Sequence, residues 1–514
     1  MDTKVILENG QIPAASPESV GISSKCILDY FDRMQGECPS LQAFQIVRKG
    51  KLIADAAAKP YTHESFHRIY SAAKGIVATA VLLCVQDGLY TLEEPVLKYF
   101  PKEWLPADPD PRWEELTLYH LLTMTSGHKQ DTMFKMLMGK SDCWVRTFLE
   151  NRPDYAFGTH FVYDMGAQYV MNELVRLAAG KDLGQFMEER IFGPMGVRAQ
   201  WEYTPIEGHF WSSTMQLQPE GLTKLSLLYL QDGEWDGKQL LRPDLVRYAM
   251  KQHVPCVSEH GDRGNRENGA GYSLHMWRNS FGGIRYSGGQ GQLGIIIPEY
   301  ETVYSTLAAA DGPQTNAMID AFYECVLRKC HEKPLPEDPE AFSLLRACLE
   351  AFNLAPSGVA GSSPLAEMIS GKTYVFEENP AGQKSVRFDF TGGEVTITTD
   401  SGRGVRAHTC GLNGEWKESR GYLLIDKADG EIADLDRIFN YDVKATLLSG
   451  GWRTDDSFEF KLRGPALLCD YTYVCTFEGN EVRIALSSTC HSDPTVRMGE
   501  SAAFAATELR GRAV

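Results

Sequence analysis

The sequence predicts an α+β protein that ends in an all-β unit. Strand patterns occur near residues 42–57 and again near 282–309, and helical patterns fill most of the interval between them. Early and late strands that meet in one sheet explain this order better than a run of parallel βαβ units. Beyond residue 365 the pattern changes to short alternating strands separated by turn residues, which is typical of a barrel or a sandwich.

Hydrophobic periodicity predicts the elements of the first part in order. A helix over 24–35 precedes two strands, 42–47 and 52–57, that flank a Lys49–Gly50 turn. Residues 71–87 are nearly all small or apolar and precede Gly88, so we expect a long helix that is buried on every side. The remaining predicted elements are helices over 166–179 and 217–231 and strands over 282–286, 294–297 and 302–309.

Shifts in composition divide the chain. Its 514 residues are enough for several domains, because a domain has roughly 150 residues. Charge and proline between 331 and 339, followed by Gly, Ser, Ala and Pro between 355 and 364, indicate a linker that contains a short helix over 340–352. We therefore expect a first domain over 1–333, a linker over 334–365 and an all-β accessory domain over 366–514.

The charge balance excludes several classes of partner. Lys and Arg total 51 against 68 for Asp and Glu, so the formal charge is 51 − 68 = −17 and we expect no nucleic-acid partner. No apolar run approaches the roughly 18 residues that span a bilayer, so we expect no membrane partner. The first residues lack the features of an export signal, which favours a cytoplasmic protein with reduced thiols.

Cysteine and histidine spacing predicts neither a metal nor a cofactor. The 12 Cys contain no Cys-x-x-Cys pair, and the 12 His contain no His-Glu-x-x-His or similar spacing. We therefore expect no metal site, and the serine chemistry considered next implies no organic cofactor.

Two Ser-x-x-Lys patterns are candidates for a nucleophile with its base. A Ser and a Lys three residues apart on a helix share one face, and a neutral Lys can take the proton of the hydroxyl. Ser71 and Lys74 begin the predicted buried helix, whereas Ser126 and Lys129 flank a glycine with no apolar run after it. The pattern alone also permits a simpler interpretation of Ser71, as a helix cap beside an exposed Lys. No Gly-x-Ser-x-Gly motif occurs, which argues against an α/β-hydrolase.

Three ordered segments carry a resemblance to a known family. They are 67–74 (HRIYSAAK), 118–127 (LYHLLTMTSG) and 271–298, which begins with Gly-Tyr. Together they resemble the serine β-lactamase and penicillin-binding-protein superfamily, and within it the class C-like esterase and amidase branch that includes aminohexanoate-dimer (nylon-oligomer) hydrolases. The resemblance spans about residues 15–310. It implies a β-lactamase-like fold, in which helices flank an antiparallel sheet and a helical subdomain is added.

The resemblance also implies roles for particular residues. Ser71 is the expected nucleophile, Lys74 its base and Tyr163, in the place of the family's Tyr-x-Asn motif, the proton shuttle, although Met165 stands where Asn is usual. Without the resemblance, the sequence alone predicts that Tyr163 is a buried core residue. The backbone N–H groups of Ser71 and Gly289 are the expected oxyanion hole.

The third motif of the family corresponds to residues 286–289. Tyr286, Ser287 and Gly288 are therefore expected to bind substrate, with Tyr286 where a cation is usual. Arg285 is adjacent, but strand alternation points it to the opposite face. Without that cation a substrate carboxylate lacks its partner, which argues against β-lactam substrates. Trp277 is interpreted as a core residue, with a place in an apolar cleft as the alternative.

The sequence thus predicts a serine hydrolase that forms an acyl-enzyme on Ser71 and cleaves small-molecule esters or amides. Two alternatives stay open. One is an acyltransferase that passes the same acyl group to an alcohol or amine. The other is a non-catalytic binding or sensor protein on a penicillin-binding-like fold, which the changes at Met165 and Tyr286 keep open. Substrate identity, oligomeric state and the role of the all-β domain are not determined by the sequence.

Overall fold

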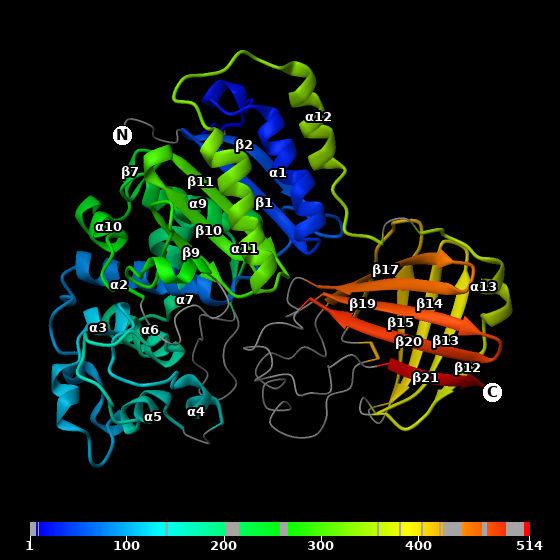
Figure 1. Cartoon of the computed structure of the whole chain (residues 1–514). Coiled ribbons are helices and arrows are strands. Elements are labelled where there is room, and N and C mark those ends of the chain that lie inside the picture. Colours follow the sequence, from blue (N-terminus) through cyan, green and yellow to red (C-terminus); the bar gives the residue numbers. More distant parts are fainter. Residues whose placement is uncertain are drawn as a thin grey trace.

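A computed structural model describes the chain over residues 7–8, 10–138, 142–201, 215–256, 266–356, 359–379, 382–401, 404–420, 423–424, 445–464, 470–489 and 508–514. These residues form a six-stranded sheet flanked by helices, a helical region beside it, and a larger sheet closed into a barrel (Figure 1). The α+β prediction, with an all-β unit at the C-terminal end, is confirmed. Within these ranges no helix has both the length and the apolar character to cross a bilayer.

The six-stranded sheet joins the two ends of the first part of the chain. The order of its described strands is β2-β1-β11-β10-β9-β8, and every pair is antiparallel. Early strand β1 therefore lies between early strand β2 and late strand β11, so that the first and last strands meet as predicted. The strands are β1 Leu41–Arg48, β2 Lys51–Ala57, β8 Trp277–Arg278, β9 Ile284–Gly288, β10 Gln292–Ile297 and β11 Thr302–Ala308.

Two predicted boundaries shift for identifiable reasons. The strand expected over 282–286 starts later, at Ile284, because Gly282 (φ 102°) and Gly283 (φ 67°) form the preceding turn. The helix expected over 217–231 is α9 (Pro219–Leu230). Its start is set by Pro219 in the first turn, while Leu217 pairs with His67 in a small sheet instead.

Helices cover both faces of the six-stranded sheet and bury two apolar layers. Consecutive strand residues point to opposite faces, so Ile295 packs with α1 (Ser24–Glu37), α11 (Gly312–Ala321) and α12 (Pro339–Glu350). Its neighbour Ile296 packs with the layer that contains α2 (Ala73–Gln86) and α9. The second layer is the one that holds the candidate site.

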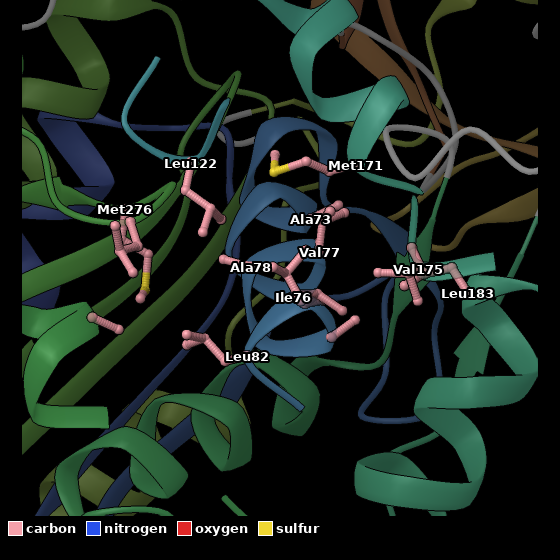
Figure 2. Packing of buried hydrophobic residues seen from close by; sticks show 14 of the residues in the cluster. Ala73, Ile76, Val77, Ala78, Leu82, Leu122, Met171, Val175, Leu183 and Met276 are labelled. Atoms are coloured by element: carbon pink, nitrogen blue, oxygen red, sulfur yellow. The ribbon is translucent and has the colours of Figure 1, made fainter. Parts of the chain in front are cut away.

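Helix α2 is buried on every side, as its sequence predicts. All residues from Ala73 to Cys84 are buried, and the side chains of Ile76, Val77 and Leu82 lie among residues of several other elements (Figure 2). Leu122 of α3, Met171 and Val175 of α6, and Leu183 of α7 are seen around it. The helices of this region are α3 Leu118–Leu122, α4 Met133–Met138, α5 Trp144–Glu150, α6 Met165–Ala179 and α7 Leu183–Met187.

Smaller elements complete this part of the chain. Three short strands form one sheet in the order β3-β5-β4, and β6 pairs with β7. The bounds of these elements are β3 His67–Arg68, β4 Ala199–Gln200, β5 Gln216–Leu217, β6 Glu234–Trp235, β7 Lys238–Gln239, α8 Gly193–Met195 and α10 Pro243–Met250.

The second sheet closes into a barrel, which decides between the predicted barrel and sandwich. Its described strands run in the order β15-β14-β13-β12-β21-β20-β19-β18-β17, and β15 pairs with β17 to close this ring of nine, while β16 pairs with β17 as well. An odd number of strands cannot alternate direction all the way round a ring. One parallel pair is therefore required, and it is the contact of Gly411 in β15 with Ser449 in β17.

The barrel has its own apolar interior, made of residues from Ile369 onward. Its strands are β12 Thr373–Phe376, β13 Gln383–Thr391, β14 Glu394–Ser401, β15 Gly404–Gly411, β16 Lys417–Arg420, β17 Ala445–Thr454, β18 Ser457–Arg463, β19 Tyr471–Glu478, β20 Glu481–Ser488 and β21 Glu508–Ala513, with α13 Pro364–Ile369 preceding them. The helix expected in the linker is α12, whose Leu345 and Leu349 belong to the core beside the six-stranded sheet. The domain limits 1–333, 334–365 and 366–514 stay a prediction.

Candidate active site

The candidate nucleophile lies at the junction of a short 3-10 helix and α2. Ser71 is in the 3-10 helix η2 (Tyr70–Ala72), and Lys74 is in the first turn of α2. The Nζ of Lys74 lies 3.0 Å from the Oγ of Ser71 and donates a hydrogen bond to it. Lys74 is fully buried and Ser71 is half-buried, so the hydroxyl is reachable while the amine behind it is shielded.

Backbone strain accompanies this junction. Tyr70, directly before Ser71, has a φ of 47°, in the left-handed region that residues with a side chain rarely adopt. Such strain is typical of residues that a fold holds in place for function. The interpretation of Ser71 as a cap beside an exposed Lys does not fit, because Lys74 is buried.

Tyr163 lies beside the Ser71–Lys74 pair. It precedes α6, and its ring centroid is 4.6 Å from the Nζ of Lys74. The indole of Trp277, in β8, stacks on the same ring with centroids 5.5 Å apart and planes 18° apart. The structure thus brings together Ser71, Lys74 and Tyr163, and it places Trp277 in the buried core beside Tyr163, which agrees with its interpretation as a core residue.

The predicted oxyanion residue Gly289 is in the turn after β9. A Cβ added at Gly288 would lie 2.1 Å from the carbonyl oxygen of Ile69, so only glycine lets β9 approach the residues before Ser71 this closely. A Cβ added at Gly289 would meet nothing within 4 Å among the described residues. Gly289 therefore faces open space next to a strand that is packed against η2.

The expectation that Tyr286 binds substrate is wrong. Its ring is buried against α2, so close that a Cβ added at Gly75 would lie 2.4 Å from the ring. Tyr286 and Gly288 share the face of β9 that packs on α2, and burial raises the pKa of the Tyr286 phenol. Gly288 likewise acts by close packing rather than by exposure to a ligand. A substrate contact by Ser287, which is half-buried on the other face of the strand, stays a prediction.

Arg285 is buried on that other face, as strand alternation predicts. Its guanidinium donates to the side-chain carbonyls of Asn268 (2.7 Å) and Asn279 (3.2 Å), and burial lowers its pKa to about 10. It does not replace the cation that the third motif lacks.

The second Ser-x-x-Lys pattern does not form a pair. Lys129 is exposed and its Nζ is 3.2 Å from a carboxylate oxygen of Asp154. The Oγ of Ser126 is instead 3.3 Å from Nδ1 of His128. The Ser126 side chain is buried, which does not fit a nucleophile.

A buried contact between His128 and Asp164, next to Tyr163, was not predicted. One carboxylate oxygen of Asp164 accepts hydrogen bonds from the N–H (3.0 Å) and hydroxyl (2.8 Å) of Thr132, and the other lies 3.3 Å from Nδ1 of His128. Burial opposes ionisation of Asp164, but these donors outweigh it and hold its pKa below the usual value. Nε2 of His128 faces the carbonyl of Asn151 at 2.8 Å, so both ring nitrogens face acceptors.

Two other histidines, His67 and His275, are buried as neutral rings. Burial lowers the pKa of each to about 3. His275 lies beside α3, and its Nε2 is 3.1 Å from the carbonyl oxygen of Leu121 in that helix. Neither histidine was singled out from the sequence for this behaviour.

The free energy of unfolding should fall as the pH is lowered from 7 to 5. Each of these histidines binds a proton readily only in the unfolded chain, where the pKa is about 6.5. The contribution of each histidine to the free energy of unfolding is complete above pH 6.5. Below that pH it should fall by about 1.4 kcal/mol for each histidine and for each pH unit. Urea unfolding at pH 7, 6 and 5 measures this slope.

A His67→Gln variant is the control for the pH dependence of stability. It should unfold more easily at pH 7, because the bond from His67 to Gln42 changes, and its free energy of unfolding should depend on pH less steeply than that of the wild type, by about 1.4 kcal/mol per pH unit. Equal slopes for the two proteins would contradict the assignment of His67 as a neutral buried ring.

Other candidate chemistry is limited in the described part of the chain. Over those residues, no group of three or more His, Cys, Asp or Glu side chains is arranged to hold a metal ion. The ten cysteines that fall within them are free thiols.

The fold and the sequence comparisons define the class of this protein. Helices flanking an antiparallel sheet are the architecture of the serine β-lactamase and penicillin-binding-protein superfamily, and the resemblance inferred from the motifs is confirmed. The chain belongs to the Beta-lactamase family, whose profile matches residues 32–325, more than half of the 514 residues.

Individual relatives match over shorter stretches. The chain is 27% identical over 173 residues to Esterase EstB of Burkholderia gladioli, covering 30% of this chain and 43% of the esterase. It is 28% identical over 152 residues to Acyltransferase mokF of Monascus pilosus, covering 25% of this chain and 36% of that protein. The matches therefore span less than half the length of either relative.

One solved structure aligns with part of the chain. A putative 6-aminohexanoate-dimer hydrolase from Bacillus anthracis aligns with a TM-score of 0.46 at 17% identity and covers 63% of this chain and 87% of its own.

Proposed function

We propose that the protein is a serine hydrolase that forms an acyl-enzyme on Ser71 and cleaves small-molecule esters or amides. The observation that carries the proposal is the 3.0 Å hydrogen bond between the buried Lys74 amine and the half-buried Ser71 hydroxyl. A nucleophile within hydrogen-bond reach of a base, with a third group beside the base, is the arrangement that nucleophilic catalysis requires. Tyr163 is that third group.

In the acylation step, the Oγ of Ser71 attacks the carbonyl carbon of the substrate. Lys74, in its neutral form, takes the hydroxyl proton, and the carbonyl oxygen becomes an oxyanion. The N–H groups of Ser71 and Gly289 donate to that oxyanion, since backbone donors fixed before the reaction stabilise charge as it develops.

Collapse of the tetrahedral intermediate breaks the bond to the leaving group. The alkoxide or amine that departs receives a proton through the Tyr163 phenol, which is resupplied from Lys74. Water then attacks the acyl-enzyme, and the same residues act in reverse to release the acid and restore the Ser71 hydroxyl.

Acyl transfer is the second candidate, and the similarity to an acyltransferase favours keeping it. The acyl-enzyme would be identical, and an alcohol or amine would replace water in the second step. Product analysis with added alcohols separates the two: hydrolysis gives the free acid, and transfer gives a new ester in preference to the acid.

The test of the proposal is covalent labelling with a fluorophosphonate. Mass spectrometry of the digested protein should find one adduct on Ser71, and Ser71→Ala should remove it together with turnover in a screen of small esters and amides. An adduct on Ser126, or a folded wild-type protein that neither labels nor turns over any ester, would overturn the proposal in favour of a binding role.

β-Lactams should be poor substrates compared with short-chain esters. The ring carboxylate of a β-lactam would be desolvated without a charged partner, because Tyr286 is buried against α2 and Arg285 points to the opposite face. Met165 also lacks the amide usual at its position. We expect nitrocefin to be hydrolysed at least about 100-fold less efficiently than p-nitrophenyl acetate, a difference of ~2.7 kcal/mol. Comparable kcat/KM values for the two would contradict this expectation.

A further inference from the structure

The turn that presents Gly289 adopts a backbone conformation that needs support. Gln290 has a φ of 65° and Gly291 a φ of 83°, so a residue with a side chain occupies the left-handed region directly after Gly289. This conformation is costly for a residue other than glycine, and it persists only where surrounding contacts enforce it. Gly289 has no side chain of its own to anchor it. Its orientation therefore depends on contacts made by its neighbours.

One side chain, Gln292, makes several of those contacts. Its Nε2 faces the carbonyl oxygens of Gly289 (3.3 Å), Gln290 (3.2 Å) and Ala308 (2.5 Å) and donates to them. Its Oε1 accepts from the N–H of Ala308 at 3.4 Å. Gln292 is 2% exposed, so it points inward and does not line the pocket.

These bonds connect the turn to both neighbouring strands. Gln292 is the first residue of β10 and lies opposite Gly288 of β9, while Ala308 is the last residue of β11. The carbonyl of Gln290 is also held by the N–H of Ala310 at 3.0 Å. The single amide group of Gln292 thus ties the turn to the sheet.

We propose that Gln292 is a positioning residue that fixes the Gly289 N–H as an oxyanion donor. The inference rests on the proposed function, in which that N–H stabilises the oxyanion on Ser71 substrates. An oxyanion donor is effective because it is already oriented when charge develops. Without the bonds from Gln292 to the carbonyls of Gly289 and Gln290, the turn can rotate, and the N–H loses its fixed direction.

The test compares two substitutions of buried glutamines in the same sheet. Gln292→Met keeps the approximate volume and removes the amide. Gln45→Met is the matched control: Gln45 is 4% exposed in β1 and bonds to Asp55 (2.9 Å) and Thr223 (2.6 Å), away from the turn. We expect fluorophosphonate labelling of Ser71 to slow by about tenfold or more in Gln292→Met and to stay within twofold in Gln45→Met.

A second readout separates loss of the oxyanion donor from loss of folded protein. An oxoester places oxygen in the oxyanion hole, whereas the matching thionoester places sulfur, a weaker hydrogen-bond acceptor. In Gln292→Met the rate on the oxoester should fall more than the rate on the thionoester, with KM nearly unchanged. A smaller fraction of folded enzyme lowers both rates equally and leaves their ratio as in the wild type.

Each outcome decides the inference. Wild-type labelling in Gln292→Met, or equal losses on the oxoester and the thionoester, overturns the role of Gln292 and leaves the proposed function intact. Absence of labelling at Ser71 in the wild type overturns the proposed function, and this inference falls with it. If Gln45→Met also changes the ratio of the oxoester rate to the thionoester rate, the effect is a general one of losing a buried amide. That result would also overturn the role of Gln292.

Discussion

Replacing Lys74 by methionine should slow acylation of Ser71 by at least about a hundredfold, the usual scale for a positioned base. Methionine preserves the apolar stem and removes the amine that bonds to the Ser71 hydroxyl. Lys74 is fully buried, so an apolar replacement should be tolerated by the fold. The measurement is the pre-steady-state rate of acylation with an activated ester.

The chain supplies its own control for the Lys74 substitution. Lys129 is the lysine of the other Ser-x-x-Lys pattern, and its side chain is 62% exposed beside Asp154. Lys129→Met should acylate at the wild-type rate. A comparable loss in both variants, or an unaffected rate in Lys74→Met, would contradict the assignment of Lys74 as the base.

Replacing Tyr163 by phenylalanine should reduce turnover of amides by about a hundredfold, and of activated esters by much less. An amine leaving group must be protonated as it departs, whereas p-nitrophenolate leaves without a proton. Phenylalanine keeps the stacking on Trp277 and removes the hydroxyl. The measurement is the ratio of kcat/KM for an anilide to that for a p-nitrophenyl ester.

Tyr169→Phe is the control for the Tyr163 substitution. Tyr169 is buried in α6, near Tyr163 along the chain, and its ring packs on Trp144 at 5.0 Å. Removing the Tyr169 hydroxyl should leave the ratio of kcat/KM for the anilide to kcat/KM for the ester unchanged. An unaltered ratio in Tyr163→Phe would make Tyr163 a packing residue, which was its interpretation without the family resemblance.

The parts of the site that could be predicted are those that are close together in the sequence. Ser71 and Lys74 are three residues apart, and the apolar run after them predicts a buried helix, so their geometry follows from helical periodicity. The Ser126–Lys129 pattern has the same spacing but no helix follows it, and there the structure shows no pair. The surrounding hydrophobic pattern, rather than the four-residue motif, distinguished the two.

The error at Tyr286 has a different origin. The motif placed the residue correctly on an inner strand beside the nucleophile. The tyrosine ring is buried there because it packs on α2 at Gly75, where the absence of a side chain leaves room for the ring. A contact between residues more than two hundred positions apart is not visible in a local pattern.

The contacts made by His128 and Gln292 could not be predicted for the same reason. His128 meets Asp164 across a buried interface between a loop and the start of α6, and Gln292 meets Ala308 across two strands. A hydrogen-bonding signal was present at Asp164, an acidic residue directly before a helix, which is typical of an N-cap. The partners of these residues required the fold.

The complete burial of α2 has a consequence for how the protein loses activity. Ser71 and Lys74 lie at the start of a helix whose residues from Ala73 to Cys84 have no exposed face. Amide hydrogens in such a helix reach solvent only when the surrounding core opens, so they should be among the slowest in the chain to exchange with deuterium. The nucleophile and its base are thus carried by the part of the domain that melts last, and inactivation by urea should coincide with global unfolding instead of preceding it.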